Sequence, residues 1–276
     1  MRRIPARLAA LAGCVVCAAF GQEGPDRFFD SGGVRIRYQV SGSGPAVVLV
    51  HGFGETLERW GRTQASQVLS PHFQVIVFDI RAHGRSGKPH DPQAYGPELA
   101  SDVVRLLEHL GIGKAHIVGY SMGALVGLDM ALLHPRHVAS LVLGGAGWNP
   151  PETLESFRRQ AEAFEQWKAP IAARADAKAL GALLRGLRVL TESEVRSIQV
   201  PMAAIIGVND RFLGNVRRLS AIRPDVKVEI IPEADHATAV THPRFAEALL
   251  EFLKLARLSQ FGRLAAGKSF RISRGV

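Results

Sequence analysis

Apolar runs and amphipathic stretches alternate along most of the chain. Short runs such as 46–50, AVVLV, are continuously apolar and rich in β-branched residues, which is typical of strands buried on both faces of a sheet. Apolar residues spaced three or four apart, as in 98–110, instead predict helices. Strands are predicted at Val34–Val40, Ala46–Val50, Phe73–Ile80, His116–Gly119, Val138–Leu143, Val200–Ile206 and Val226–Ile231, and helices at Glu98–Leu110, Ala124–Leu133, Phe212–Ala221 and Arg244–Leu258. This order predicts an α/β fold with a doubly wound, mostly parallel sheet.

The alternation is interrupted between Asn149 and Ile198. Four residues in this segment share one helical face, and leucines at helical spacing form a second stripe between positions 180 and 190. The first stripe consists of Phe157, Ala161, Phe164 and Trp167. We expect two or three short helices here, forming a small helical cap over the sheet.

The first residues have the layout of an export signal. Three arginines lie within Met1–Arg7, the segment Leu8–Phe20 is apolar and small, and polar residues begin at Gln22. This order predicts a secretory signal cleaved before Gln22, and therefore a secreted or periplasmic protein. The alternative is a lipoprotein, because 11–14, LAGC, resembles a lipobox and would place a lipid on Cys14. Cys14 and Cys17 are the only two cysteines, so the cleaved protein would have none and thiol catalysis would be excluded.

The net charge of +9 comes from the two ends of the chain. Three arginines precede Leu8, and six basic residues follow Leu253 without a compensating acid. A nucleic-acid-binding protein should carry its basic excess on the folded surface, so no nucleic-acid partner is expected. The tail is expected to be a solvated terminus, with a loose, peripheral contact to an anionic membrane or cell-wall surface as the alternative. No apolar run reaches the ~18 residues of a membrane-spanning helix, and nothing indicates an oligomeric state.

These observations divide the chain into five parts. They are a signal segment (1–21), the first part of the α/β core (28–148), the cap (149–198), the second part of the core (199–257) and a basic tail (258–276).

The motif at 119–123, GYSMG, matches G-x-S-x-G. It follows a predicted strand and opens a predicted helix, which is the context of a nucleophile elbow. A serine on such a strained turn projects its hydroxyl beyond the sheet. Ser121 is therefore the candidate nucleophile.

A loop that could hold an oxyanion follows the buried strand at 46–50. Acyl transfer places negative charge on the carbonyl oxygen, which two preorganised N–H groups should receive. The backbone N–H groups of Phe53 and Met122 are the candidates. His51, at the start of this loop, is expected to hold the loop by hydrogen bonds rather than to act as a base.

A serine nucleophile also needs a base and an acid that orients it. His236 follows the strand that ends at Ile231, and Asp210 follows the strand that ends at Ile206. Doubly wound sheets place their sites beyond such strand ends. The order Ser121, Asp210, His236 is that of the hydrolase triad. Asp235 and Glu233 are weaker candidates for the acid.

Together these motifs resemble the α/β-hydrolase fold superfamily, in its serine-nucleophile, esterase-like branch, over residues 28–255. The turn Asp79–Ser86 is similar to the family's D-x-R-G-x-G-x-S turn, except that Ala82 stands where glycine is usual. The resemblance implies that this turn is structural and that 149–198 is the family's cap.

The resemblance also narrows the reaction. Dehalogenases and epoxide hydrolases of this superfamily use an aspartate nucleophile. A serine at position 121 therefore argues against both of these activities. We therefore expect a serine hydrolase that cleaves carboxylic esters of small or medium apolar acyl groups through an acyl-enzyme, with a small-molecule ester as its partner. A lactonase, a carbon–carbon bond hydrolase or a perhydrolase stays open. So does a ligand-binding or signalling protein of the same fold with slow turnover.

Three tryptophans, Trp60, Trp148 and Trp167, are expected to line the substrate pocket. No spacing of histidines, cysteines or carboxylates suggests a metal site, and the triad chemistry needs no cofactor, so neither is expected.

Overall fold

The computed structural model describes residues 24–166 and 175–266. The predicted signal segment with Cys14 and Cys17, the cap residue Trp167 and the last part of the basic tail, residues 267–276, lie outside this part of the chain. Within it, no helix is long and apolar enough to cross a bilayer.

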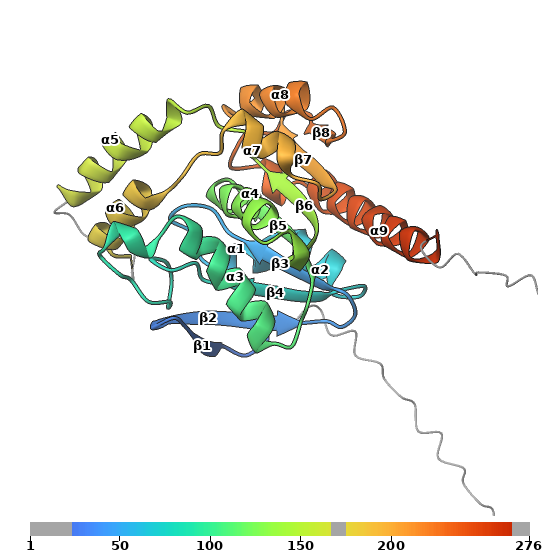
Figure 1. Ribbon diagram of the computed structural model, residues 1–276, viewed down its shortest axis with the longest axis horizontal. Helices are drawn as coiled ribbons and strands as arrows, with labels where there is room; N and C mark the ends of the chain where they lie inside the picture. The colour runs from blue at the N-terminus through green and yellow to red at the C-terminus, as the bar shows by residue number, and fades with distance from the viewer. Residues whose placement is uncertain (1–23, 167–174, 267–276) are drawn as a thin grey trace, which may run out of the picture.

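The strands of the described residues form one eight-stranded sheet in the order β1-β2-β4-β3-β5-β6-β7-β8 (Figure 1). The six strands from β3 to β8 pair in parallel, whereas β2 is antiparallel to both β4 and β1. The bounds are β1 Arg27–Ser31, β2 Val34–Ser41, β3 Ala46–Val50, β4 Gln74–Phe78, β5 Ala115–Tyr120, β6 Val138–Gly144, β7 Met202–Gly207 and β8 Lys227–Ile231. This mostly parallel sheet confirms the predicted fold class.

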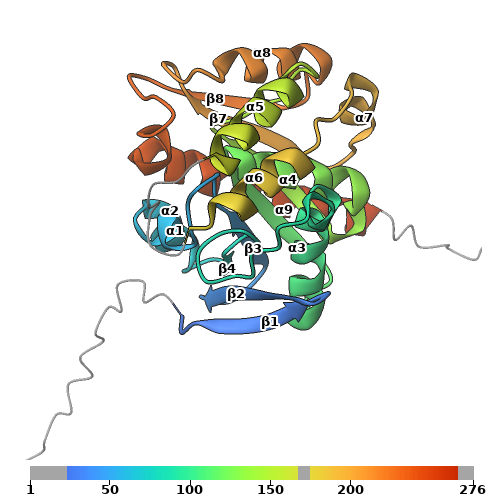
Figure 2. The same ribbon diagram turned by 90° about the vertical axis from the view of Figure 1, so that its left-hand side faces the viewer.

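Helices cover both faces of the sheet (Figures 1 and 2). The apolar faces of α3 (Pro97–His109), α4 (Met122–Leu133) and α8 (Leu213–Ile222) belong to one core cluster. Those of α1 (Glu58–Gly61), α2 (Gln64–Leu69) and α9 (Pro243–Ala266) belong to the other. The central strands β3, β5 and β6 are buried throughout because both of their faces are covered, which explains their mostly apolar sequences. The two buried polar side chains, His116 of β5 and Ser140 of β6, are hydrogen-bonded to each other at 2.7 Å.

The structure adds elements that the hydrophobic pattern does not predict. Strand β1 is a five-residue edge strand, and α1 and α2 have four and six residues, too few to show a helical period. Helix α9 continues to Ala266, so the first part of the expected solvated tail is helical. Short 3-10 helices occur at Pro92–Ala94, Pro135–His137 and Ala239–Thr241.

The cap contains α5 (Thr153–Glu165), α6 (Ala177–Gly186) and α7 (Glu192–Ser197). Helices α5 and α6 lie side by side, and Arg185 of α6 donates two hydrogen bonds to the Glu165 carboxylate of α5, at 2.7 and 2.8 Å. Helix α7 begins with a capping box between Thr191 and Glu194. The predicted stripes face inward, with Ala161, Leu180 and Leu183 buried.

Candidate active site

Ser121 occupies a tight turn between β5 and α4. Its backbone has φ 55° and ψ −117°. L-residues rarely adopt this conformation, because it costs about 1–3 kcal/mol. The flanking glycines make the turn possible. A Cβ on Gly119 would lie 2.1 Å from the carbonyl oxygen of Gly123, and a Cβ on Gly123 would lie 2.2 Å from that of Val50. The serine thus stands on the strained turn that a nucleophile elbow requires.

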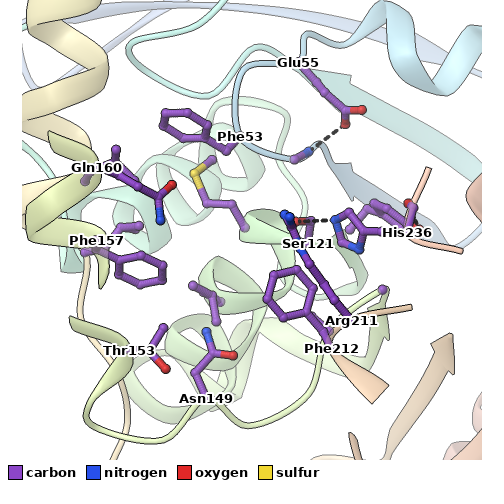
Figure 3. A pocket seen from close by; sticks show the side chains of 18 of the residues that line it. Phe53, Glu55, Ser121, Asn149, Thr153, Phe157, Gln160, Arg211, Phe212 and His236 are labelled. Carbon is purple, nitrogen blue, oxygen red and sulfur yellow. Dashed lines mark hydrogen bonds between the residues drawn. The ribbon is translucent and has the colours of Figure 1, made fainter. Parts of the chain in front are cut away.

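Three side chains from separate loops form a hydrogen-bonded row, and Figure 3 shows the contact between Ser121 and His236. The Nε2 atom of His236 lies 3.0 Å from the Ser121 hydroxyl oxygen, and its Nδ1 atom lies 2.8 Å from the Asp210 carboxylate. The Asp210 side chain is fully buried, and its other oxygen accepts the Phe212 N–H at 2.8 Å. With Nδ1–H donated to Asp210, Nε2 is free to accept the serine proton.

Two aromatic rings hold His236, and the motifs do not reveal either role. The Tyr120 hydroxyl donates to the His236 carbonyl oxygen at 2.7 Å, and its ring centre lies 5.5 Å from the imidazole. The Phe212 ring meets the imidazole edge-on at 5.0 Å. Tyr120 precedes Ser121 and Phe212 lies two residues after Asp210, so the sequence places both aromatics close to the site without indicating what they contact.

Neither of the weaker candidates for the acid, Asp235 and Glu233, hydrogen-bonds to the His236 imidazole in the described part of the chain, and Asp235 is engaged within its own loop. The Asp235 carboxylate accepts the N–H groups of Ala237 and Thr238 at 2.9 Å and the Thr238 hydroxyl at 2.7 Å. These hydrogen bonds, that from the hydroxyl foremost, hold the pKa of Asp235 below its usual range. Asp235 therefore shapes the loop that carries His236, whereas Asp210 contacts the imidazole. Glu233 is exposed.

Two buried histidines hold the loop after β3. His51 donates from Nδ1 to the Gly52 carbonyl at 2.8 Å and accepts the Ile80 N–H at Nε2, 3.1 Å away. His83 accepts the Gly54 N–H at 3.0 Å and donates to the Arg81 carbonyl at 3.2 Å. Burial lowers the pKa of His51 to about 4 and that of His83 to about 3. Both rings are therefore neutral at physiological pH, and they hold the loop through hydrogen bonds.

Two backbone N–H groups beside Ser121 have no acceptor among the described residues. They are the N–H groups of Phe53 and Met122. The N–H groups of Gly52 and Gly54, on either side of Phe53, are engaged with Glu55 and His83. Met122 is the first residue of α4, where helix N–H groups have no intrahelical partner. Both residues line the cavity in front of Ser121.

That cavity has a volume of about 390 Å³. The core supplies one wall, and the cap supplies the other through α5 and the end of α6 (Figure 3). Most of the lining is apolar, with amide and hydroxyl groups at Asn149, Thr153 and Gln160. Its apolar residues include Phe53, Met122, Leu125, Ala146, Phe157, Leu184, Leu187 and Phe212.

The described tryptophans do not line this cavity. Trp60 is fully buried in the core cluster of α1, α2 and α9, where its ring packs against apolar side chains. The Trp148 indole donates to the Leu190 carbonyl at 2.7 Å and faces a small neighbouring void beside Asp129 and Arg188. Trp167 lies outside the described residues. Phenylalanines occupy the wall instead, and Phe157 among them belongs to the predicted cap stripe.

The turn at 79–86 plays the structural role that the resemblance implies. The Asp79 carboxylate accepts the N–H groups of Leu57 and Arg85, each at 2.8 Å. Ala82 adopts φ 73°, the left-handed conformation that favours the glycine usual at this position. The described residues contain no group of three or more His, Cys, Asp or Glu side chains placed to hold a metal ion.

The comparisons with known proteins agree with this architecture. The family model of the alpha/beta hydrolase fold matches residues 45–191. A pimeloyl-acyl-carrier-protein methyl ester esterase from Vibrio cholerae is 32% identical over 254 residues, covering 78% of this chain and 96% of that protein. A fluoroacetate dehalogenase from a Burkholderia species is 39% identical over 121 residues, or 42% of this chain and 39% of that one.

Solved structures share the fold. A hydrolase from Pseudomonas aeruginosa superposes with a TM-score of 0.72 at 24% identity, covering 83% of this chain and 98% of that chain. With a sheet of this topology, a matching family model and a relative that aligns over nearly its whole length, this chain belongs to the α/β-hydrolase fold family.

Proposed function

We propose that this protein is a serine hydrolase that cleaves carboxylic esters with small or medium apolar acyl groups. The observation that carries the proposal is the hydrogen-bonded row Ser121–His236–Asp210 at the floor of a cavity lined mainly by apolar side chains. The name of the Vibrio cholerae relative, a methyl ester esterase, supports ester cleavage as the reaction class.

The geometry supports the following steps. His236 takes the proton of Ser121 as the serine oxygen forms a bond to the acyl carbon, and the Phe53 and Met122 N–H groups stabilise the resulting oxyanion. The tetrahedral intermediate breaks its bond to the alcohol oxygen, which receives the proton from His236. Water then attacks the acyl-enzyme with His236 again as base, and the acid leaves as Ser121 recovers its proton. Asp210 fixes the tautomer of His236 and stabilises the imidazolium throughout.

The cavity suits a modest apolar acyl group. Its volume of about 390 Å³ falls within the ~300–1,000 Å³ range of small-molecule sites. Phe157 and Leu184 of the cap face the core wall across it, so an acyl chain would lie between apolar surfaces.

A fluorophosphonate probe tests the nucleophile, because it reacts covalently with an activated serine. We expect labelling of the wild type at Ser121 and none of Ser121→Ala. With p-nitrophenyl acetate and butyrate, kcat should fall about 10³-fold or more, since triad members act as a unit. Ser193→Ala, on the exposed side of α7, is the matched control and should label normally. Undiminished labelling of Ser121→Ala, or a label mapped to another serine, would reject the proposal.

We further propose that the protein is exported. The support is the order of basic, apolar and polar residues in 1–22. Mass analysis of the protein recovered from its native host should show a mature chain that begins at Gln22. A chain that begins with a diacylglyceryl Cys14 would show a lipoprotein instead, and an intact Met1–Arg7 would exclude both forms of processing.

A further inference from the structure

Two arginines of the described part of the chain, Arg59 and Arg211, line the cavity, and they differ in how their charges are balanced. Arg59 lies 3.2 Å from the Glu55 carboxylate and also donates to the Ala237 carbonyl. Arg211 follows Asp210 directly in sequence, and no carboxylate of the described residues forms an ion pair with it. One guanidinium in the wall of the cavity therefore has an uncompensated charge.

The Arg211 side chain is held over an aromatic ring. Its guanidinium carbon lies 4.8 Å from the centre of the Phe212 ring, which in turn packs against His236. In Figure 3 the side chain extends along Phe212 toward Ser121. Stacking on Phe212 limits the conformations of a long side chain, so less entropy is lost when the guanidinium binds a ligand.

The other charges around the cavity are already matched. The Glu55 carboxylate accepts the Gly52 N–H at 3.1 Å and pairs with Arg59. The Asp210 carboxylate is fully buried, and its two oxygens bond to His236 and to the Phe212 N–H. Among the described residues, a ligand in the cavity thus meets one cation without an ion-pair partner, Arg211, surrounded by mostly apolar side chains.

We propose that Arg211 makes the enzyme select esters that carry a second, anionic group, a carboxylate, over neutral esters of equal size. A guanidinium fork binds a carboxylate through two parallel hydrogen bonds, while the apolar lining receives the rest of the molecule. This selectivity rests on the proposed esterase function. Arg211 is exposed, so the expected preference is about tenfold in kcat/KM.

Pairs of substrates matched in size test the proposal. The acyl arm compares the p-nitrophenyl monoester of glutaric acid with p-nitrophenyl pentanoate, and the alcohol arm compares 4-carboxyphenyl acetate with 4-acetylphenyl acetate. We expect the wild type to prefer the anionic member in one arm by about tenfold, which also identifies the part of the ester that carries the carboxylate. In Arg211→Gln this ratio should fall to near one, and Arg211→Lys should keep part of it.

Arg217→Gln is the matched control, because it removes the same charge from the exposed side of α8, outside the cavity. It should keep the wild-type ratio. If Arg217→Gln lowers the ratio as much as Arg211→Gln does, the preference comes from general charge and the proposal is overturned. An unchanged ratio in Arg211→Gln, or no preference in either arm of the wild type, overturns it as well.

A binding measurement separates this proposal from the esterase function. In the Ser121→Ala background, calorimetry with monomethyl glutarate and dimethyl glutarate needs no turnover. The monoanion should bind about tenfold more tightly, and adding Arg211→Gln should remove the difference. Equal affinities would overturn the role of Arg211 while leaving the fluorophosphonate result intact. Selective binding without fluorophosphonate labelling would instead reject the esterase and retain the anion site.

Discussion

The two walls of the cavity are built in different ways. On the core side, loops after β3, β5, β7 and β8 are fixed by hydrogen bonds to buried groups, among them His51, His83 and Asp210. On the cap side, α5 and α6 present Phe157, Gln160 and Leu184, and the two helices are joined near their ends by the exposed Arg185–Glu165 pair. The core wall is thus held by directional hydrogen bonds, whereas the cap wall contributes mainly its shape and its apolar surface.

This difference matches what each wall must do. Proton transfer and oxyanion binding need donors and acceptors at hydrogen-bond distance, and displacements near 1 Å cost large factors in rate. The core wall accordingly holds Ser121 at a strained φ of 55° against its backbone preference. An acyl chain needs only an apolar space of suitable size. We therefore expect changes in the hydrogen-bonded groups of the core wall to alter kcat, and changes in the cap wall to alter the choice of substrate. Arg211 stands apart from this division, because it lies on the core side but does not take part in the hydrogen-bonded row.

The largest effect should come from the acid of the core wall. Asp210→Asn removes the carboxylate that fixes the His236 tautomer, and kcat should fall by about 10³- to 10⁴-fold. Asp235→Asn changes the neighbouring carboxylate, which bonds only within its own loop, and should cost far less. Steady-state kinetics on p-nitrophenyl butyrate compares the two variants. A greater loss in Asp235→Asn would mean that the acid is misassigned.

A smaller effect should follow from loosening the oxyanion loop. His83→Ala removes the acceptor of the Gly54 N–H, so the adjacent Phe53 N–H loses its fixed direction. We expect kcat to fall about 10- to 100-fold with little change in KM, because the oxyanion contact forms only in the transition state. His83→Gln, whose carbonyl oxygen can accept the same N–H, should recover part of the rate.

Exposed His72→Ala is the control for loss of an imidazole and should behave as the wild type. If His83→Ala raises KM while kcat is unchanged, the histidine supports ground-state binding rather than the oxyanion loop. A loss in stability alone, with unchanged kcat in the folded fraction, would give it a purely structural role.

The contrast between the walls also explains what the sequence could predict. The chemistry of the core wall depends on local backbone constraints, so it leaves motifs: Gly119 and Gly123 make the elbow around Ser121, and strand ends place Asp210 and His236. The buried strands were predicted within one or two residues at most ends, because burial on both faces favours nearly continuous apolar runs.

The cap wall leaves a weaker signal. Apolar stripes predicted its helices, but a stripe does not show which of its residues face the core and which face a cavity. Trp60 illustrates the same limit, because a large aromatic residue fits a core as well as a pocket. Phe212 and Tyr120 act through tertiary contacts with His236 that no local pattern encodes. Short α1 and α2 are stabilised by packing, and α2 also by its N-cap Thr63, rather than by periodicity.

A change in the cap wall should act on substrate choice. Phe157→Ala enlarges the cavity opposite the core wall, so kcat/KM for p-nitrophenyl hexanoate relative to acetate should rise by about three- to tenfold. Phe28→Ala, on β1 and away from the cavity, is the matched control and should keep the wild-type ratio. An equal fall in kcat for both esters would show that Phe157 serves the chemistry rather than the shape of the site.

The smallest effect on catalysis, and a clear one on stability, is expected where the two walls join. Asp129 of α4 is buried, and its Oδ1 atom has no hydrogen-bond partner among the described residues. It lies 3.6 Å from Arg188, which belongs to the segment between α6 and α7 of the cap. Burial raises the pKa of Asp129 to about 7, well above the ~3.9 of an unfolded aspartate.

The folded state therefore holds a proton between about pH 4 and pH 7 that the unfolded state releases. The contribution of this bound proton to the free energy of unfolding is complete below pH 4 and is lost as the pH rises to about 7. Asp129→Asn keeps the neutral form at every pH, so its free energy of unfolding relative to the wild type should rise over this range by up to about 4 kcal/mol. Urea unfolding at pH 4, 5.5 and 7 measures this difference, with Asp30→Asn as an exposed control and kcat expected to stay near the wild-type value. A constant difference across the three pH values would show that Asp129 is ionised throughout, with Arg188 stabilising its charge across the joint between core and cap.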